Sequence, residues 1–165
     1  MMQPPDDFDI RFSEESDLKF LEMWFAMPNA CDDFPFGEEE KAEALKNWIG
    51  FSKYKASLTG LIGEHICAIA TLFLMPYRKV AHHASFYLIV DPKYRKKGIG
   101  TAMVRNILNL AKTRFRLESV HVELFEPSLL LPIVQRLNFA PFARQEDFIR
   151  IGSVHKPRIL LEHFF

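Results

Sequence analysis

The chain has 165 residues, of which 48% are hydrophobic, and its 21 basic residues balance its 21 acidic residues. This length favours one compact domain over residues 1–165, and zero net charge provides no overall field to attract a nucleic-acid backbone or an anionic membrane. We therefore expect no nucleic acid and no membrane as partners, and any anion site must be local. Only two cysteines, no secretory leader and no apolar run approaching about 20 residues favour the reducing cytoplasm.

The first half of the chain predicts a strand, two helices and a pair of strands. The segment "FDIRF" (8–12) alternates like a half-buried strand, and Ser13 or Ser16 is placed to cap a helix behind it. The turn-rich "NACDDFPFG" (29–37) separates this helix from a second one, which begins after three glutamates. Residues that favour strands flank a glycine-bearing break within 55–75 and predict two strands joined by a turn.

The second half predicts strands and helices in alternation and then two closing strands. "HHASFYLIV" (82–90) reads as a strand, and apolar residues at helical spacing from Ile99 to Leu110 predict the most regular helix. Further along we expect a strand at 119–125, a short helix at 127–139, and strands at 148–152 and 158–165. The order β-α-α-β-β-β-α-β-α-β-β predicts an α/β fold with a mixed, mostly antiparallel central sheet and helices on both faces.

A glycine-bearing junction, "VDPKYRKKGIGTAM" (90–103), joins one of these strands to the regular helix. A helix that starts here directs several unpaired backbone N–H groups at one point, at the positive end of its dipole, and such a point binds phosphate. Glycine allows close approach of the backbone to an anion, a threonine hydroxyl adds a donor, and three cations supply charge. The expected anion site comprises Arg95, Lys96, Lys97, Gly98, Ile99, Gly100 and Thr101.

Two familiar phosphate loops do not match this junction. The dinucleotide pattern Gly-x-Gly-x-x-Gly requires a third glycine where the chain has Met103, and the nucleotide P-loop requires a closing Gly-Lys-Ser/Thr. What is present is Arg-x-x-Gly-x-Gly at 95–100, after a strand that ends in Val-Asp-Pro. With this motif the sequence resembles the GNAT superfamily of acyl-CoA-dependent N-acyltransferases, and the order of elements over most of the chain is also the family's.

The resemblance implies a GNAT-like domain, acetyl-CoA as cofactor, and N-acetyltransferase activity on a primary amine of a small molecule or of a protein or peptide. It implies direct attack of the amine in a ternary complex, with the loop holding the pyrophosphate of coenzyme A. The strand residues Leu88, Ile89 and Val90 would line the pantetheine, and the backbone N–H of Leu88 would polarise the thioester oxygen. The acetyl group is expected because it is the family's commonest.

The usual acid of the family is missing. Relatives carry a tyrosine and an asparagine in the helix after the fifth strand, whereas the corresponding places here hold Val134 and either Pro127 or Ser128. A thiolate with an ordinary pKa of about 8.5 is already a fair leaving group, so loss of the acid slows such an enzyme without abolishing the reaction.

Substitutes for the catalytic acid and base are not marked by spacing. We select Tyr87 and Glu123, on the strands at 82–90 and 119–125, as candidates; Ser85 stands where many relatives carry a glutamate. Three histidines near strand ends are alternatives, because a histidine titrates near neutrality: His82, His83 and His121. Adjacent strand residues point to opposite faces and no His or Cys pair has ligand spacing, so we expect no metal site, and no motif indicates a covalent nucleophile.

The acceptor site of relatives lies beside the first two helices, which maps here to about residues 24–36. Asp32 and Asp33 are candidates to attract a cationic amine, and Phe34 and Phe36 to pack on its apolar part; a solvated acidic turn is the simpler alternative. The Phe-rich C-terminal strands leave open a homodimer. We also expect Gly98→Glu to abolish cofactor binding by placing bulk and negative charge where the pyrophosphate would lie.

Two other functions fit the same residues. An intact loop without the usual tyrosine and asparagine is also what a catalytically degenerate module would show, one that binds acetyl-CoA or coenzyme A as a sensor or partner-docking domain. A third reading is an interaction domain that uses the fold and its 16 phenylalanines and binds no coenzyme A.

Overall fold

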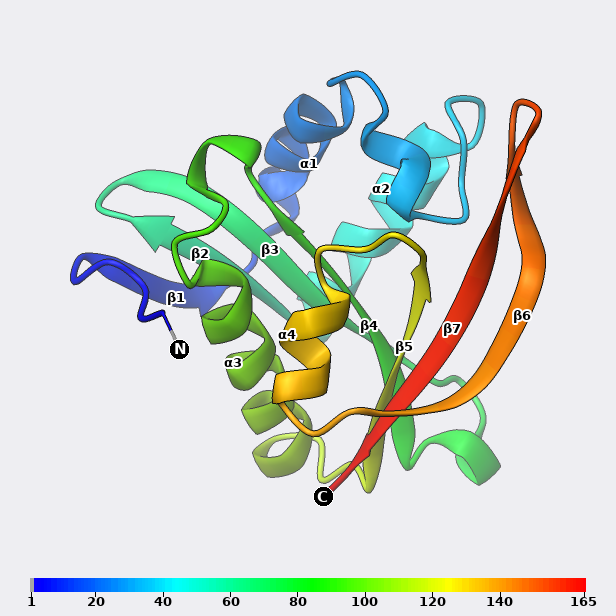
Figure 1. Ribbon diagram of the computed structural model, residues 1–165. Coiled ribbons are helices and arrows are strands. Elements are labelled where there is room, and N and C mark those ends of the chain that lie inside the picture. The colour runs from blue at the N-terminus through cyan, green and yellow to red at the C-terminus, as the bar shows by residue number, and fades with distance from the viewer. Residues whose placement is uncertain (1) are drawn as a thin grey trace.

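The computed structural model describes residues 2–165. Seven strands form one sheet in the order β1-β2-β3-β4-β5-β7-β6, and every neighbouring pair is antiparallel except β4 with β5 (Figure 1). The strands are β1 (Phe8–Phe12), β2 (Ser57–Ile62), β3 (His65–Leu74), β4 (His83–Val90), β5 (Ser119–Phe125), β6 (Ala140–Ile151) and β7 (Val154–Phe164). The helices are α1 (Leu18–Phe25), α2 (Lys41–Gly50), α3 (Ile99–Thr113) and α4 (Leu131–Arg136).

The predicted order of elements and the mixed, mostly antiparallel sheet are confirmed. Helices α3 and α4 cover one face of the sheet, where Met103 and Ile107 are fully buried, and α1 and α2 cover the other, around Trp48 and Phe25 (Figure 1). Two apolar cores therefore lie back to back, one on each side of the sheet, as the hydrophobic faces of its helices require.

The C-terminal hairpin differs most from expectation. We expected strands at 148–152 and 158–165, whereas β6 begins at Ala140 and β7 at Val154, on either side of Gly152 in a left-handed turn (φ 62°). Most of β6 is exposed and has no apolar face, so its alternation gives no signal; pairing with β7 is what makes it a strand. The last helix is shorter than expected, because Asn138 adopts a left-handed conformation (φ 65°) just beyond α4.

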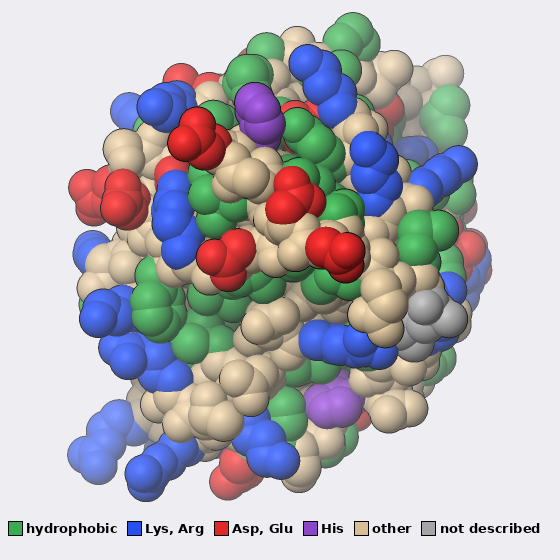
Figure 2. All heavy atoms as spheres, turned by 90° about the vertical axis from the view of Figure 1, so that its left-hand side faces the viewer, with side chains coloured by type: hydrophobic (Ala, Val, Ile, Leu, Met, Phe, Trp, Pro, Cys, Tyr) green, Lys and Arg blue, Asp and Glu red, His purple; other side chains and the backbone are tan. Residues whose placement is uncertain are grey.

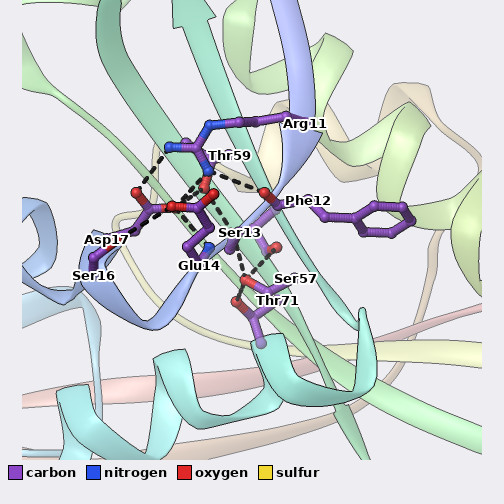
Figure 3. A network of polar contacts seen from close by, with 10 residues as sticks. Arg11, Phe12, Ser13, Glu14, Ser16, Asp17, Ser57, Thr59 and Thr71 are labelled. Atoms are coloured by element: carbon purple, nitrogen blue, oxygen red, sulfur yellow. Dashed lines mark hydrogen bonds and ion pairs between the residues drawn. The ribbon is translucent and has the colours of Figure 1, made fainter.

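A buried polar network ties β1 to β2 and to the start of α1 (Figure 3). Both Asp17 oxygens accept hydrogen bonds from Arg11 at 2.8 Å, and the Thr59 hydroxyl donates to Asp17 at 2.9 Å. The Ser13 hydroxyl lies 2.7 Å from that of Thr59 and accepts from Ser57 at 2.9 Å. The expectation that Ser13 or Ser16 caps the helix is therefore wrong, because the Ser13 hydroxyl belongs to this network and the Ser16 hydroxyl donates to Glu14 Oε2 at 3.3 Å.

The two cysteines are free thiols on opposite sides of the sheet, since Cys31 lies in the α1–α2 core and Cys67 in the α3–α4 core. Within residues 2–165, no helix combines the length and the apolar character needed to cross a bilayer. Figure 2 shows one face of the molecule, on which basic and acidic side chains are interspersed with apolar ones. This mixture agrees with the zero net charge.

Candidate active site

The sheet opens between its two parallel strands. β4 and β5 pair only at His83↔Ser119, Ala84↔Val120 and Ser85↔His121, although they continue to Val90 and Phe125. Beyond Ser85 and His121 each strand therefore has an edge without a partner strand, and the two edges face each other across a gap.

Backbone groups of β4 point into this gap. The register with β3 is uninterrupted from Ala84 to Val90, and the N–H of Asp91 donates to Cys67 at 2.8 Å. Because directions alternate along an antiparallel strand, Ile89 turns its N–H toward β3, whereas Leu88 turns its N–H and C=O toward the gap. The Val90 carbonyl, which also faces the gap, accepts a hydrogen bond from Arg95 Nε at 3.2 Å.

A cavity of about 1080 Å³ follows the gap and continues to the start of α3. It is somewhat larger than an ordinary ligand site, which suits a long cofactor and an acceptor together. Twelve of the predicted site residues line it: Asp33, Phe34, Tyr87, Leu88, Ile89, Val90, Arg95, Lys96, Gly98, Gly100, Thr101 and Glu123.

Four predicted residues do not line this cavity: Asp32, Phe36, Lys97 and Ile99. The Lys97 ammonium lies 5.5 Å from the centre of the Tyr94 ring, and the Ile99 side chain is buried in the α3–α4 core. The Phe36 ring packs on Phe25 at 5.5 Å. A contact of Ile99 with an anion is thus limited to its backbone N–H.

The loop before α3 has the geometry of an anion site. Lys96 (φ 61°) and Gly98 (φ 80°) are left-handed on either side of Lys97, an alternation that turns successive N–H groups toward one concavity. The first intrahelical bond runs from Ala102 to the Gly98 carbonyl at 3.2 Å, so the N–H groups that precede it have no partner within the helix, as an anion site requires. The Thr101 side chain is buried and lines the cavity.

Other segments of the chain pack so closely against the two glycines of the motif that an added side chain would crowd them. A Cβ on Gly98 would lie 2.8 Å from backbone atoms of Met2 and Gln3, and one on Gly100 would lie 3.0 Å from Ile133 Cδ1. A Gly98→Glu substitution would first collide with residues 2–3 in a backbone conformation that side chains rarely adopt. A loss of cofactor binding in this variant could therefore result from displacement of residues 2–3 as well as from obstruction of the pyrophosphate site.

Tyr87 and Glu123 stand at the gap from opposite strands. The Tyr87 ring packs against Phe73 at 4.6 Å and Trp48 at 5.2 Å, and burial together with the charge of Glu123 raises the pKa of Tyr87 to about 12. Tyr87 therefore keeps its proton at neutral pH. Glu123 Oε2 accepts a hydrogen bond from Arg158 Nη1 at 2.8 Å, an ion pair that fixes the position of the carboxylate.

A second cavity, of about 600 Å³, meets the first at the gap. Both are lined by Phe86, Tyr87 and Glu123. Along β5, His121 and Glu123 alternate with Val122, which packs in the α3–α4 core, so they face the α1–α2 side of the sheet. The remaining residues of this lining are His82, His83, Ser85, Ser119, His121, Phe142, Arg158, Leu160, Glu162 and Phe164.

Trp24 and Met27 line the first cavity from α1 and the segment after it, within the range 24–36 that was expected beside the acceptor. Other lining residues were not found by reading the sequence, among them Leu129 and Arg136 from around α4. Arg158, the partner of Glu123, is 35 residues away along the chain, and no short motif marks such a pair. In the places of the family's tyrosine and asparagine, Val134 is fully buried and Ser128 lines the first cavity.

Residues 21–129 match the model of the family described as Acetyltransferase (GNAT) family. The match covers more than half of the chain. The chain belongs to the GNAT acetyltransferase family. The predicted family is thus confirmed, and so is acetyl-CoA as the cofactor that the family uses. A comparison with curated protein sequences gives no match.

Solved structures share the GNAT fold with this chain. One is yncA of Salmonella typhimurium, a putative acetyltransferase with its cofactor acetyl-CoA: identity is 11%, the TM-score is 0.80, and 96% of this chain and 94% of that chain are covered. The ribosomal-protein-alanine N-acetyltransferase of Brucella melitensis has 13% identity and a TM-score of 0.80, with coverage of 95% and 99%. An N-acetyltransferase of Staphylococcus aureus Mu50 has 15% identity and a TM-score of 0.78, with coverage of 96% and 99%. At these identities the similarity shows the fold.

Proposed function

We propose that residues 1–165 act as one N-acetyltransferase domain that moves an acetyl group from acetyl-CoA to a primary amine of a small molecule or of a protein or peptide. The observation that carries the proposal is the gap between β4 and β5, with the free backbone groups of Leu88 on one edge and the start of α3 at its end. This combination offers one site for a thioester and one for a pyrophosphate in a single cavity.

The cofactor-binding residues follow from the cavity lining. The N–H groups of Gly98, Gly100 and Thr101 would bind the pyrophosphate, with Arg95 and Lys96 as the nearby cations of the lining. Leu88, Ile89 and Val90 would line the pantetheine, with Leu88 as the residue whose backbone groups are free to bond it. When bound, acetyl-CoA supplies the acetyl thioester that the amine attacks.

Three groups are assigned to the transfer. The Leu88 N–H stabilises negative charge that develops on the carbonyl oxygen, a donor of a kind worth roughly 3–4 kcal/mol. The Glu123 carboxylate accepts the proton of the amine, directly or through water, and Tyr87 donates a proton to the departing sulfur. Both candidates remain proposals, and Tyr87 replaces the acid that Val134 cannot provide.

Direct transfer is favoured over a covalent acyl-enzyme by the state of the two cysteines. Burial, with the nearby charge of Asp91, raises the pKa of Cys67 to about 12, and burial also raises the pKa of Cys31. Both stay as thiols near neutrality, and neither is the thiolate that such a mechanism requires.

A cytoplasmic location and a homodimer stay predictions.

Of the residues expected to contact the acceptor from the α1–α2 connection, we keep Asp33 and Phe34 in the proposal. Both line the first cavity, whereas Asp32 and Phe36 do not. Asp33 also lies within electrostatic reach of Lys156 and Arg95, which compete with an amine for its charge. Phe34 packs edge-on to Tyr87 at 5.4 Å and so presents an apolar surface beside the gap.

A second candidate function is a degenerate module that binds acetyl-CoA or coenzyme A without turnover. Val134, fully buried in the place of the family's tyrosine, favours it. The deciding experiment is calorimetric titration of acetyl-CoA and dephospho-CoA, followed by thiol release over a panel of amines and peptides. Binding with release supports the transferase, binding without release supports the module, and absence of binding contradicts both.

A variant separates the backbone donor from the rest of the site. Leu88→Pro removes the N–H that faces the gap without removing a hydrogen bond to β3, and Leu88→Ala keeps it. We expect acetyl transfer by Leu88→Pro to fall about 100- to 1,000-fold below that of Leu88→Ala. Circular dichroism and the melting temperature would establish that both variants are folded. Equal rates in folded variants would remove the Leu88 N–H from the mechanism.

A further inference from the structure

The second cavity is lined by charged side chains, not all of which take part in the proposed transfer step. Its lining contains two carboxylates, Glu123 and Glu162, and one permanent cation, Arg158. Glu123 and Arg158 neutralise each other through their 2.8 Å ion pair. The Glu162 side chain is half-buried and, among residues 2–165, makes no hydrogen bond or ion pair. Glu162 is therefore the carboxylate of this lining that no Lys or Arg of the described residues pairs with, and a cationic ligand would balance its charge.

The other polar groups of the cavity leave this charge open. The Arg158 guanidinium is held by Glu123 and Gln145 and lies 3.9 Å from the centre of the Phe148 ring, so it is not free to turn to Glu162. Burial and the neighbouring His83 lower the pKa of His121, the cross-strand partner of Glu162, so its imidazole is uncharged near neutrality.

The strand pairing gives the distance between Glu162 and Glu123, which lies at the reaction centre. The reacting nitrogen has to reach the junction of the two cavities, where Glu123 lies. Glu162 pairs with His121 across β5 and β7, and His121 precedes Glu123 by two residues along β5. Two strand residues span about 6.8 Å, and neighbouring strands lie about 5 Å apart, so the two glutamate Cα atoms are roughly 8 Å apart.

We propose that the acceptor, in the reaction proposed above, occupies the second cavity and is a short aliphatic diamine. One amine reaches the junction and is acetylated, while the second stays protonated and pairs with Glu162. With carbon–carbon bonds of about 1.5 Å, an unbranched chain of about four to six carbons bridges such a separation. Leu160 and the exposed rings of Phe142 and Phe164 provide apolar surface for the chain.

The test compares 1,5-diaminopentane with 1-aminopentane, which differ only in the second amine. Calorimetry in the presence of coenzyme A measures their binding, and thiol release from acetyl-CoA measures kcat/KM. The variants are Glu162→Gln and, as a matched control, Glu64→Gln in the exposed β2–β3 turn. Melting temperatures would show that both variants are folded.

We expect the wild type to bind the diamine at least about tenfold more tightly than the monoamine, and Glu162→Gln to remove that preference. Glu162→Gln should leave monoamine binding and acetyl-CoA affinity unchanged, and Glu64→Gln should change none of these. Equal binding of both amines by the wild type, or a preference that survives Glu162→Gln, overturns the inference. Acetylation of the monoamine would uphold the transferase in that case. Diamine binding without any turnover would overturn the transferase and the diamine's role as acceptor, and would leave Glu162 as a residue that binds a cation.

Discussion

Replacement of Asp17 by asparagine tests whether the polar network of Figure 3 stabilises the fold. The Asp17 side chain is 3% exposed and accepts two hydrogen bonds from Arg11 at 2.8 Å, one from Thr59 at 2.9 Å and one from the Glu14 N–H at 3.0 Å. Asparagine keeps the shape of the side chain, but it removes the charge and turns one acceptor oxygen into a donor that faces other donors.

The expected loss follows from the exposure of the two partners. Removing one partner of a fully buried ion pair costs roughly 3–5 kcal/mol. The Arg11 side chain retains 35% exposure and recovers part of its hydration, so we expect Asp17→Asn to lower the free energy of unfolding by about 2 kcal/mol. For a chain of this length that is a fall of about 4–8 °C in melting temperature.

Urea unfolding followed by the fluorescence of Trp24 and Trp48, both buried, measures the difference. Asp9→Asn serves as the control, because Asp9 is exposed and, within residues 2–165, its side chain accepts a hydrogen bond only from the adjacent Ile10 N–H. We expect the control to remain within about 0.5 kcal/mol of the wild type. An equally small effect of Asp17→Asn would refute the reasoning.

The pH dependence gives a second criterion. Burial alone would raise the pKa of Asp17, but the hydrogen bonds from Arg11, the Glu14 N–H and Thr59 outweigh it, so its pKa lies below the ordinary 3.8. A lowered folded-state pKa adds stability that is complete above the unfolded value and is lost as pH falls through the folded value. The gap between wild type and Asp17→Asn should therefore narrow below about pH 4. A constant gap would contradict an ionic contribution.

Three further predictions concern the site. Tyr87→Phe should lower kcat about tenfold or more without changing acetyl-CoA affinity, and an unchanged kcat would remove Tyr87 from the reaction. In calorimetry at two salt concentrations, Lys96→Met should weaken acetyl-CoA binding more at low salt. Lys97→Met should not, because Lys97 does not line the cavity and its ammonium lies over the Tyr94 ring; equal effects would contradict the geometry. Gly98→Ala should cost about 1–3 kcal/mol more in urea unfolding than Gly152→Ala, which shares a positive φ but has no atom within 4 Å; equal losses would show that residues 2–3 do not constrain the loop.

Short-range patterns carried the prediction of the fold and of the cofactor loop. Strand alternation and helical spacing are properties of ten or so neighbouring residues, and they were sufficient for the order of all eleven major elements. The Arg-x-x-Gly-x-Gly motif is likewise local, because the residues that bind an anion at a helix start are consecutive. The structure leaves Lys97 and the Ile99 side chain outside the cavity, and the binding role of the other loop residues stays a prediction.

What the tertiary structure decided depends on partners that are distant in sequence. An open edge at Leu88 to Val90 was implied only by the family resemblance, and no pattern within 82–125 shows that β4 and β5 separate after Ser85, because the separation is a property of how two strands meet. β6 has no apolar face of its own and exists through its pairing with β7. Arg158 neutralises Glu123 and no residue neutralises Glu162 among those described, a difference that arises from the direction of side chains on adjacent strands. Backbone pairing and side-chain charge are satisfied in space rather than along the chain, so these features required the folded molecule.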